Sequence, residues 1–227
     1  AIMSPFLGML SDAVGRKSFV VGALVFLTLP TALIAQSPDI EWIALWRFIQ
    51  GLSVPGITVV IIAYIGEEFE GQSITELMSF YVSGAVLGGF MGRFLLGHLH
   101  EYFGWRNAYY VLTVLTILSA LWVAKTLPKS KHFEANPNFR SIIKILSAHL
   151  VNRYVVTACL LGACVLFSLV GCFTFINLYL ADSPYDLGTG ALANIFAVYL
   201  IGVIITPFST ILLRRFGSAR TIIVAVI

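Results

Sequence analysis

Long apolar runs separated by short polar segments set the pattern of this chain. A membrane-spanning helix needs about 20 mainly apolar residues, and six runs approach or exceed that length. These runs cover residues 18–36, 42–66, 77–99, 107–125, 154–180 and 190–213. Shorter apolar stubs lie at residues 1–10 and after residue 220. The pattern predicts an all-α polytopic membrane protein with six complete spans and two partial ones.

Residues 126–153 interrupt this pattern with a polar segment that is too long for a tight connection. Its apolar side chains recur at helical intervals opposite cations, at Ile142, Ile143, Leu146 and Leu150. Such spacing is typical of an amphipathic helix lying on the membrane surface, although a plain solvated linker explains the same composition. We expect this segment to separate an N-terminal bundle, residues 1–125, from a C-terminal bundle, residues 154–227.

The composition indicates that the solvent of most of the chain is lipid. Of the 227 residues 59% are hydrophobic and 11% are charged, and the mean hydropathy is +0.92. Soluble domains carry roughly a quarter charged residues, so a water-soluble core cannot absorb this apolar excess. The chain starts without a methionine and both of its ends fall inside apolar runs. We therefore expect an internal fragment of a longer protein.

Neither a metal nor an organic cofactor is predicted. Cys159, Cys164 and Cys172 lie in one apolar run, and neither their odd number nor their spacing fits a disulfide framework or a metal site. A membrane enzyme would need intramembrane clusters of His, Asp or Ser, which the sequence lacks, so no enzymatic activity is expected. The net charge of +3 is carried by loops rather than by a basic face, which argues against a nucleic-acid partner.

The placement of the cations predicts the orientation in the membrane. If the loops alternate between the two sides, one side carries residues 11–17, 67–76, 125–153 and 214–220. That side holds 11 of the 14 Lys and Arg residues, whereas the other side holds only Arg106. The positive-inside rule therefore predicts that the first set, with the opening loop and the 126–153 linker, is cytoplasmic.

The loop after the first apolar stub combines an acid, two glycines and two adjacent cations within ten residues. Its candidate functional residues are Gly8, Asp12, Gly15, Arg16 and Lys17. Gly15 permits the positive φ of a tight turn. Asp12 is placed to pair with Arg16 or to lie near a helix N-terminus, where the helix dipole favours an anion. A simple topogenic turn is the alternative, but positive charge alone would serve that purpose without an acid or two glycines.

A degenerate copy of this loop follows the last complete span. It contains Arg214, Arg215, Gly217 and Arg220, with an arginine where Asp12 would lie. Six spans begin between the two copies, and an even number preserves orientation, so the copies are expected to be parallel repeats.

Gly8, Leu10, Asp12, Gly15, Arg16 and Lys17 match the signature G-x-L-x-D-x-x-G-R-K of the major facilitator superfamily. The chain resembles this family from late in its second helix to early in its ninth, although Ala13 stands where the family often has a cation. The resemblance implies two six-helix bundles, here truncated at both ends. It also implies that the opening loop is a latch between the halves, which breaks as the cytoplasmic side opens.

Arg47 lies within a predicted span, where a cation costs at least ~2.5 kcal/mol unless it is paired or faces water. Snorkelling to the outer surface is one explanation. Arg47, Gln50 and Gly51 also match the family signature R-x-x-Q-G, and the resemblance implies a role in proton coupling. The complete spans contain no deep Asp or Glu, so the titrating carboxylate is expected elsewhere in the protein.

A glycine stripe marks the span at 77–99, with Gly84, Gly88 and Gly92 at four-residue intervals and Gly89 alongside. In lipid such a stripe favours close helix packing. The resemblance adds the antiporter signature G-x-x-x-G-P-x-x-G-G, in which Gly89 replaces the proline and Arg93 the last glycine. Arg93 is interpreted either as a partner for an anionic substrate or as a side chain that snorkels outward from the helix end.

The resemblance implies secondary active transport of a small organic solute by alternating access. We expect proton-coupled efflux driven by the proton gradient, and sugar or metabolite uptake by the same fold is the alternative. From a different class, a channel or a non-transporting membrane sensor is a further alternative. The expected setting is the bacterial inner membrane, with the protein monomeric and its partners the lipid bilayer and a small-molecule substrate.

Overall fold

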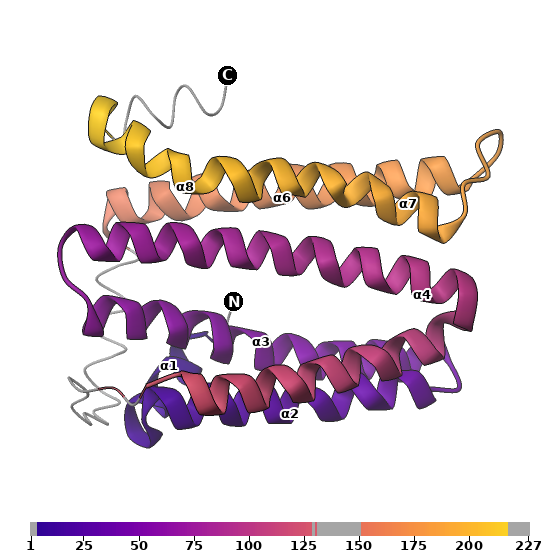
Figure 1. Cartoon of the computed structure of the whole chain (residues 1–227), viewed down its shortest axis with the longest axis horizontal. Helices are drawn as coiled ribbons and strands as arrows, with labels where there is room; N and C mark the ends of the chain where they lie inside the picture. The colour runs from indigo at the N-terminus through magenta and orange to yellow at the C-terminus, as the bar shows by residue number, and fades with distance from the viewer. Residues whose placement is uncertain (1–3, 129, 131–150, 218–227) are drawn as a thin grey trace.

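The computed structural model describes residues 4–128, 130 and 151–217 (Figure 1). Its elements are α1 (Ser4–Val14), α2 (Arg16–Gln36), α3 (Ile40–Glu68), α4 (Gln72–Thr126), α6 (Arg153–Ala181), α7 (Thr189–Ile195), the 3₁₀ turn η1 (Phe196–Val198) and α8 (Tyr199–Phe216). The described residues contain no strand, which confirms the all-α prediction.

Helix α4 is a hairpin of two antiparallel helical arms. Only Gly104, with φ 79° and ψ 160°, leaves the helical conformation inside it, and the ribbon doubles back there in Figure 1. A residue with a Cβ rarely adopts this φ, so the reversal depends on glycine. The sequence predicts a loop at 100–106. The structure instead confines the turn to one residue, because the polar side chains on either side of it remain helical.

Positive φ values also mark the connections at the opposite end of the bundle. Gly15, Gly71 and Gly217 have φ values of 96°, 60° and 77°. We call this end the Gly15 end and the other the Gly104 end. The opening loop is much shorter than the sequence suggests, because α1 continues to Val14 and α2 begins at Arg16. The Gly15 N–H donates to the Ser11 carbonyl at 2.9 Å and thereby closes the last turn of α1.

Among the described residues, five helices are long and apolar enough to cross a membrane. One of them is α4, which contains two of the predicted runs, so the six predicted runs are all accounted for. The last predicted run, residues 190–213, is not one continuous α-helix. A 3₁₀ turn, η1, lies between α7 and α8. The expected surface helix in the 126–153 segment lies outside the described residues, as does the stub after residue 220.

The helices form two groups that meet along α4 (Figure 1). In the first group, α2 packs against α3 and α4, and α1 packs against α3 and α2. The buried apolar side chains gather in this group, among them Val20, Ile34, Val60 and Ala108. In the second group, α7 and α8 pack against α4, and α6 lies beside α7.

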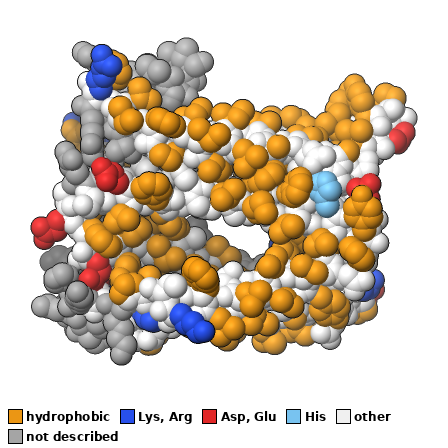
Figure 2. Space-filling view, viewed as in Figure 1, with side chains coloured by type: hydrophobic (Ala, Val, Ile, Leu, Met, Phe, Trp, Pro, Cys, Tyr) orange, Lys and Arg blue, Asp and Glu red, His pale blue; other side chains and the backbone are white. Residues whose placement is uncertain are grey.

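Apolar side chains cover most of the face drawn in Figure 2, whereas most of its Asp and Glu side chains lie toward the two ends. Exposed large apolar residues occur on every long helix, and α6 has no buried residue at all. In water this surface would be strongly unfavourable, whereas lipid or neighbouring helices satisfy it. The exposed surface therefore supports the membrane environment that the composition indicates.

Candidate functional site

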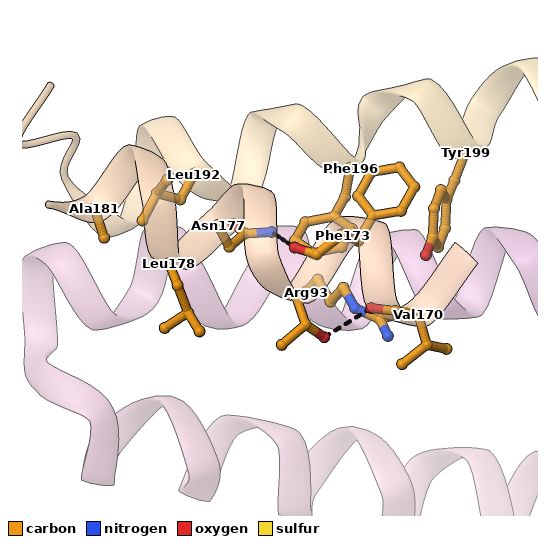
Figure 3. A pocket seen from close by; sticks show the side chains of 10 residues that line it. Arg93, Val170, Phe173, Asn177, Leu178, Ala181, Leu192, Phe196 and Tyr199 are labelled. Carbon is orange, nitrogen blue, oxygen red and sulfur yellow. Dashed lines mark hydrogen bonds between the residues drawn. The ribbon is translucent and has the colours of Figure 1, made fainter. Parts of the chain in front are cut away.

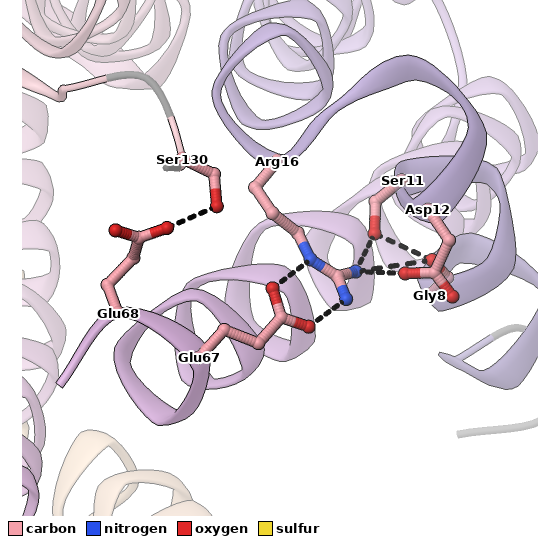
Figure 4. Close-up of polar contacts among 7 residues, drawn as sticks. All are labelled: Gly8, Ser11, Asp12, Arg16, Glu67, Glu68 and Ser130. Atoms are coloured by element: carbon pink, nitrogen blue, oxygen red, sulfur yellow. Dashed lines mark hydrogen bonds and ion pairs between the residues drawn. The ribbon is translucent and has the colours of Figure 1, made fainter. Parts of the chain in front are cut away.

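Arg16 lies at the centre of a charged cluster at the Gly15 end (Figure 4). It is only 8% exposed, although it begins α2. Its Nε donates to Glu67 Oε2 at 3.1 Å, and its Nη2 lies 2.5 Å from Glu67 Oε1. On the other side, Nη1 donates to Ser11 Oγ and lies 2.5 Å from Asp12 Oδ1. One guanidinium thus joins the ends of α1, α2 and α3.

The two carboxylates hold Arg16 in different ways. Glu67 uses both oxygens on two guanidinium nitrogens, the bidentate geometry that makes such pairs strong. Asp12 is close enough for an ion pair, but its Oδ1 accepts no aligned hydrogen bond. Glu67 therefore fixes the orientation of the guanidinium through two contacts, whereas Asp12 pairs with it through one.

A second contact extends this cluster toward the segment that follows α4. Ser130 Oγ donates to Glu68 Oε1 at 2.5 Å, next to Glu67 in sequence (Figure 4). A residue four positions after the end of α4 thus touches the end of α3.

The remaining residues of the predicted loop have more local roles. The Gly8 carbonyl accepts from Ser11 Oγ at 2.6 Å and from Arg16 Nη1 at 3.5 Å. Lys17 is partly exposed. Sequence reasoning pairs Asp12 with Arg16 but misses Glu67, which lies 51 residues away from its partner. The acidic run that begins at Glu67 could have indicated a partner for Arg16, because the alternating loops put it on the same side of the membrane as the opening loop.

Arg47 is an exposed side chain of α3 that forms a separate polar contact within the first group of helices. Its guanidinium donates to the Tyr109 hydroxyl and to Gln50 Oε1 at 3.4 Å. Gln50 in turn donates to Thr31 Oγ1 at 2.8 Å, so α2, α3 and the second arm of α4 are connected. No carboxylate of the described residues pairs with Arg47. A Cβ added at Gly51 would meet no atom within 4 Å.

The glycine stripe of α4 has no close neighbour in the described part of the chain. A Cβ at Gly84, Gly88 or Gly92 would meet nothing within 4 Å, and at Gly89 it would meet only Arg93 Nη1, at 3.5 Å. The close helix approach is found instead at Gly97, which continues the same helix toward Gly104. The described segments therefore do not pack closely against the stripe, although the sequence predicts that a helix should.

Gly97 forms a tight junction between α4 and α7. A Cβ there would lie 2.8 Å from the Thr189 carbonyl and would overlap Ala193. Thr189 Oγ1 donates to the Gly97 carbonyl at 3.2 Å and lies 3.1 Å from His100 Nδ1. This α4–α7 junction joins the two groups of helices at the Gly104 end.

A cavity of about 360 Å³ lies beside this junction, among α4, α6, α7, η1 and α8 (Figure 3). Arg93 enters it from α4, and its guanidinium lies 5.0 Å from the Phe196 ring centroid and 5.7 Å from that of Tyr199. Asn177 of α6 lines the same cavity. Arg93 lies more than two turns before the reversal at Gly104 and not at a helix end.

The second copy of the opening loop is only partly described. Arg214 and Arg215 fall in the last turn of α8, and Arg215 lies over the Phe216 ring at 5.6 Å. Gly217 follows with a positive φ, as Gly15 does after α1. Arg220 lies outside the described residues. The backbone thus ends the two helices in the same way.

The long apolar helices and the two groups that meet at α4 define a multi-pass integral membrane protein. Within that class, the model of the Major Facilitator Superfamily matches residues 1–227. The chain therefore belongs to this family, which consists of transporters and not enzymes.

Named relatives agree with this assignment. An uncharacterized transporter of Buchnera aphidicola subsp. Schizaphis graminum is 30% identical over 98% of this chain and 54% of its own length. The uncharacterized MFS-type transporter YybF of Bacillus subtilis is 29% identical over 95% of the chain and 54% of its own length. The inner membrane transport protein YnfM of Escherichia coli is 29% identical over 93% and 51%. The chain spans about half the length of these relatives, and no solved structure matches it.

Proposed function

We propose that the full-length protein carries a small organic solute across the membrane by alternating access between two groups of helices. The cavity at Arg93 carries this proposal, because α4 borders it on one side and α6 to α8 border it on the other. A cavity between two groups that rock against each other can face first one side of the membrane and then the other. Relatives named as transporters support the same activity.

The described contacts of Arg16 all lie within the first group of helices, and none of them forms the expected latch between the two groups. We propose that the cluster instead locks α1, α2 and α3 in one arrangement at the cytoplasmic side, and we keep the name latch for this lock. The bidentate pair with Glu67 and the ion pair with Asp12 stabilise this one arrangement of α1, α2 and α3. The excess of Lys and Arg in the loops of the Gly15 end supports the cytoplasmic orientation. The bacterial relatives, one of them named an inner membrane protein, support placement in a bacterial inner membrane.

The proposal includes proton-coupled export. Arg47 is a cation within a membrane span, and the described partners of its guanidinium are neutral. An acid that came close to Arg47 would neutralise this charge when ionised and leave it unpaired when protonated, so the local charge would follow proton binding. The matches at Gly84, Gly88 and Gly92 to the antiporter signature support the outward direction. Uptake of a metabolite is the second candidate, favoured by the arginine that replaces the last glycine of that signature.

Transport in reconstituted vesicles tests the proposed function. The full-length protein is placed in vesicles with an imposed pH gradient, and benzenesulfonate, ethidium and glucose serve as anionic, cationic and neutral probes. We expect saturable movement of at least one probe that an uncoupler abolishes, with protein-free vesicles as the control. The direction relative to the gradient separates export by antiport from uptake. Flux that neither saturates nor responds to the uncoupler would indicate a channel and contradict the proposal.

A further inference from the structure

Arg93 is a charged side chain in an otherwise apolar setting. It lies 11 residues before Gly104, about 16 Å along the helix at 1.5 Å per residue, and about 32 Å from the start of α4. A helix that crosses a hydrocarbon layer about 30 Å thick near its middle places this position within that layer. Its charge therefore needs a partner or access to water.

The described residues satisfy that need only in part. Arg93 Nη1 donates to the Gly89 carbonyl at 3.0 Å, within the same helix. The rings of Phe196 and Tyr199 add cation–π attraction, which balances the charge only in part. No carboxylate of the described chain pairs with it. Arg16, by contrast, has two acidic partners. The guanidinium of Arg93 thus keeps N–H donors that have no acceptor among the described residues.

The cavity around Arg93 has the size and lining of a small-molecule site. Its volume of about 360 Å³ lies within the range of about 300–1,000 Å³ found for ligand pockets. Phe173, Phe196 and Tyr199 form a cluster of rings on the wall opposite α4, with centroids 4.8 to 5.7 Å apart. Figure 3 shows Arg93 pointing toward this cluster from α4.

A second polar group converges on the same space from α6. Asn177 Nδ2 donates to the Phe173 carbonyl at 2.6 Å. An amide carries two N–H donors and a carbonyl acceptor, so one N–H and the oxygen of Asn177 are still available to a ligand. The site therefore offers a cation, an amide and aromatic surface.

Resting on the proposed function, we infer that this cavity binds a small organic acid whose carboxylate pairs with Arg93. The planar or apolar body of the acid packs against the rings of Phe173, Phe196 and Tyr199. An arginine fork matches the two oxygens of a carboxylate and binds them in two parallel hydrogen bonds. Because Arg93 belongs to α4 and the rings belong to α6, η1 and α8, such a substrate touches both groups of helices at once.

Ligand binding to the purified full-length protein in detergent tests this inference. Benzoate is the probe, and benzamide is its uncharged counterpart of the same shape. Calorimetric titration is expected to show binding of benzoate and much weaker binding of benzamide. Arg93→Gln is expected to weaken benzoate binding by about 10-fold to 100-fold, the usual cost of a charge-assisted hydrogen bond. Arg93→Lys is expected to restore part of the affinity, since it keeps the charge and loses the fork.

Arg153→Gln is the matched control. Arg153 also lies over an aromatic ring, that of Tyr154 at 5.0 Å, but it is outside the cavity. It should leave benzoate binding unchanged. Equal binding of benzoate and benzamide by the unaltered protein would overturn the inference without any variant, and so would full benzoate affinity in Arg93→Gln. Saturable, uncoupler-sensitive movement of ethidium or glucose with no benzoate binding would leave the proposed function standing and reject the anionic substrate.

Discussion

The two ends of the helix bundle are held together by different physical means. At the Gly15 end a buried guanidinium bridges carboxylates on α1 and α3. At the Gly104 end, small residues of α4 and α7 approach so closely that Gly97 has no room for a side chain. The first set of contacts lies within one group of helices, whereas the second joins the two groups.

This difference indicates how each end can move. Water can replace the partners of a charged cluster as it opens, because the released groups are well solvated. A close backbone approach that separates leaves a gap and loses its dispersion contacts. The Gly15 end is therefore suited to opening and closing, and the α4–α7 junction is suited to act as a pivot.

The largest effect is expected from removing the central cation of the Gly15 end. Arg16→Ala leaves the carboxylates of Asp12 and Glu67 facing each other. Loss of one partner from a fully buried pair costs about 3–5 kcal/mol, and about 2–3 kcal/mol is expected here because the two acidic side chains are 30% and 35% exposed. Thermal unfolding in detergent measures the loss. Lys17→Ala is the control, and an equal effect there would show that charge alone matters at this end.

Gly97→Val tests the pivot directly. The added side chain would overlap Ala193 and press on the Thr189 carbonyl, so α4 and α7 must separate. Overpacking of this kind costs about 1–3 kcal/mol, which corresponds to a shift of about 5-fold to 150-fold in a two-state equilibrium. Spin-label distances between α4 and α7 would report the separation. Gly84→Val, where a Cβ meets nothing within 4 Å, should leave those distances unchanged.

The two acids of the Gly15 end should differ in effect. Glu67→Gln breaks a bidentate pair and is expected to cost about 1.5–3 kcal/mol, the range for hydrogen bonds to charged groups. Asp12→Asn should cost less stability, because Asp12 faces a single guanidinium nitrogen with one oxygen, whereas Glu67 engages two nitrogens with both of its oxygens. Denaturation midpoints of the two variants make the comparison. Vesicle transport that is unaffected by both substitutions would rule out the latch.

The smallest effect is expected at the hydroxyl of the junction. Thr189→Ala removes the hydrogen bond to the Gly97 carbonyl and the contact with His100, at a cost of about 0.5–1.5 kcal/mol. Thr113→Ala is the control, since among the described residues its hydroxyl bonds to the Tyr109 carbonyl within the same helix. If the two variants melt at the same temperature, the junction is held by packing alone.

The sequence predicts the spans well because each span follows from a local property, the length of an apolar run. The turn at Gly104 was predicted as a longer loop, since His100, Glu101 and Arg106 are polar. Polar residues can nevertheless stay helical at the end of a span, and only the backbone geometry shows that one glycine makes the turn.

The functional contacts were predictable only where they are local. Asp12 and Arg16 are four residues apart, so their pairing follows from spacing alone. The pairing of Arg16 with Glu67, and that of Gly97 with Thr189, joins residues 51 and 92 positions apart and depends on how the helices pack. The acidic run at Glu67 indicates only that acids lie at the same end of the bundle as Arg16, and it does not say which of them pairs with the arginine.

The single-residue reversal at Gly104 also gives the first arm of α4 the geometry of a lever. Gly97 lies about 10 Å from that corner and Arg93 about 16 Å, at 1.5 Å per residue. The packed junction at Gly97 is the fixed point of this arm, so a tilt of about 10° around it would move Arg93 by about 1 Å and the start of α4, about 38 Å away, by about 6.5 Å. Movement of the first arm of α4 thus grows with distance from Gly97 toward the Gly15 end.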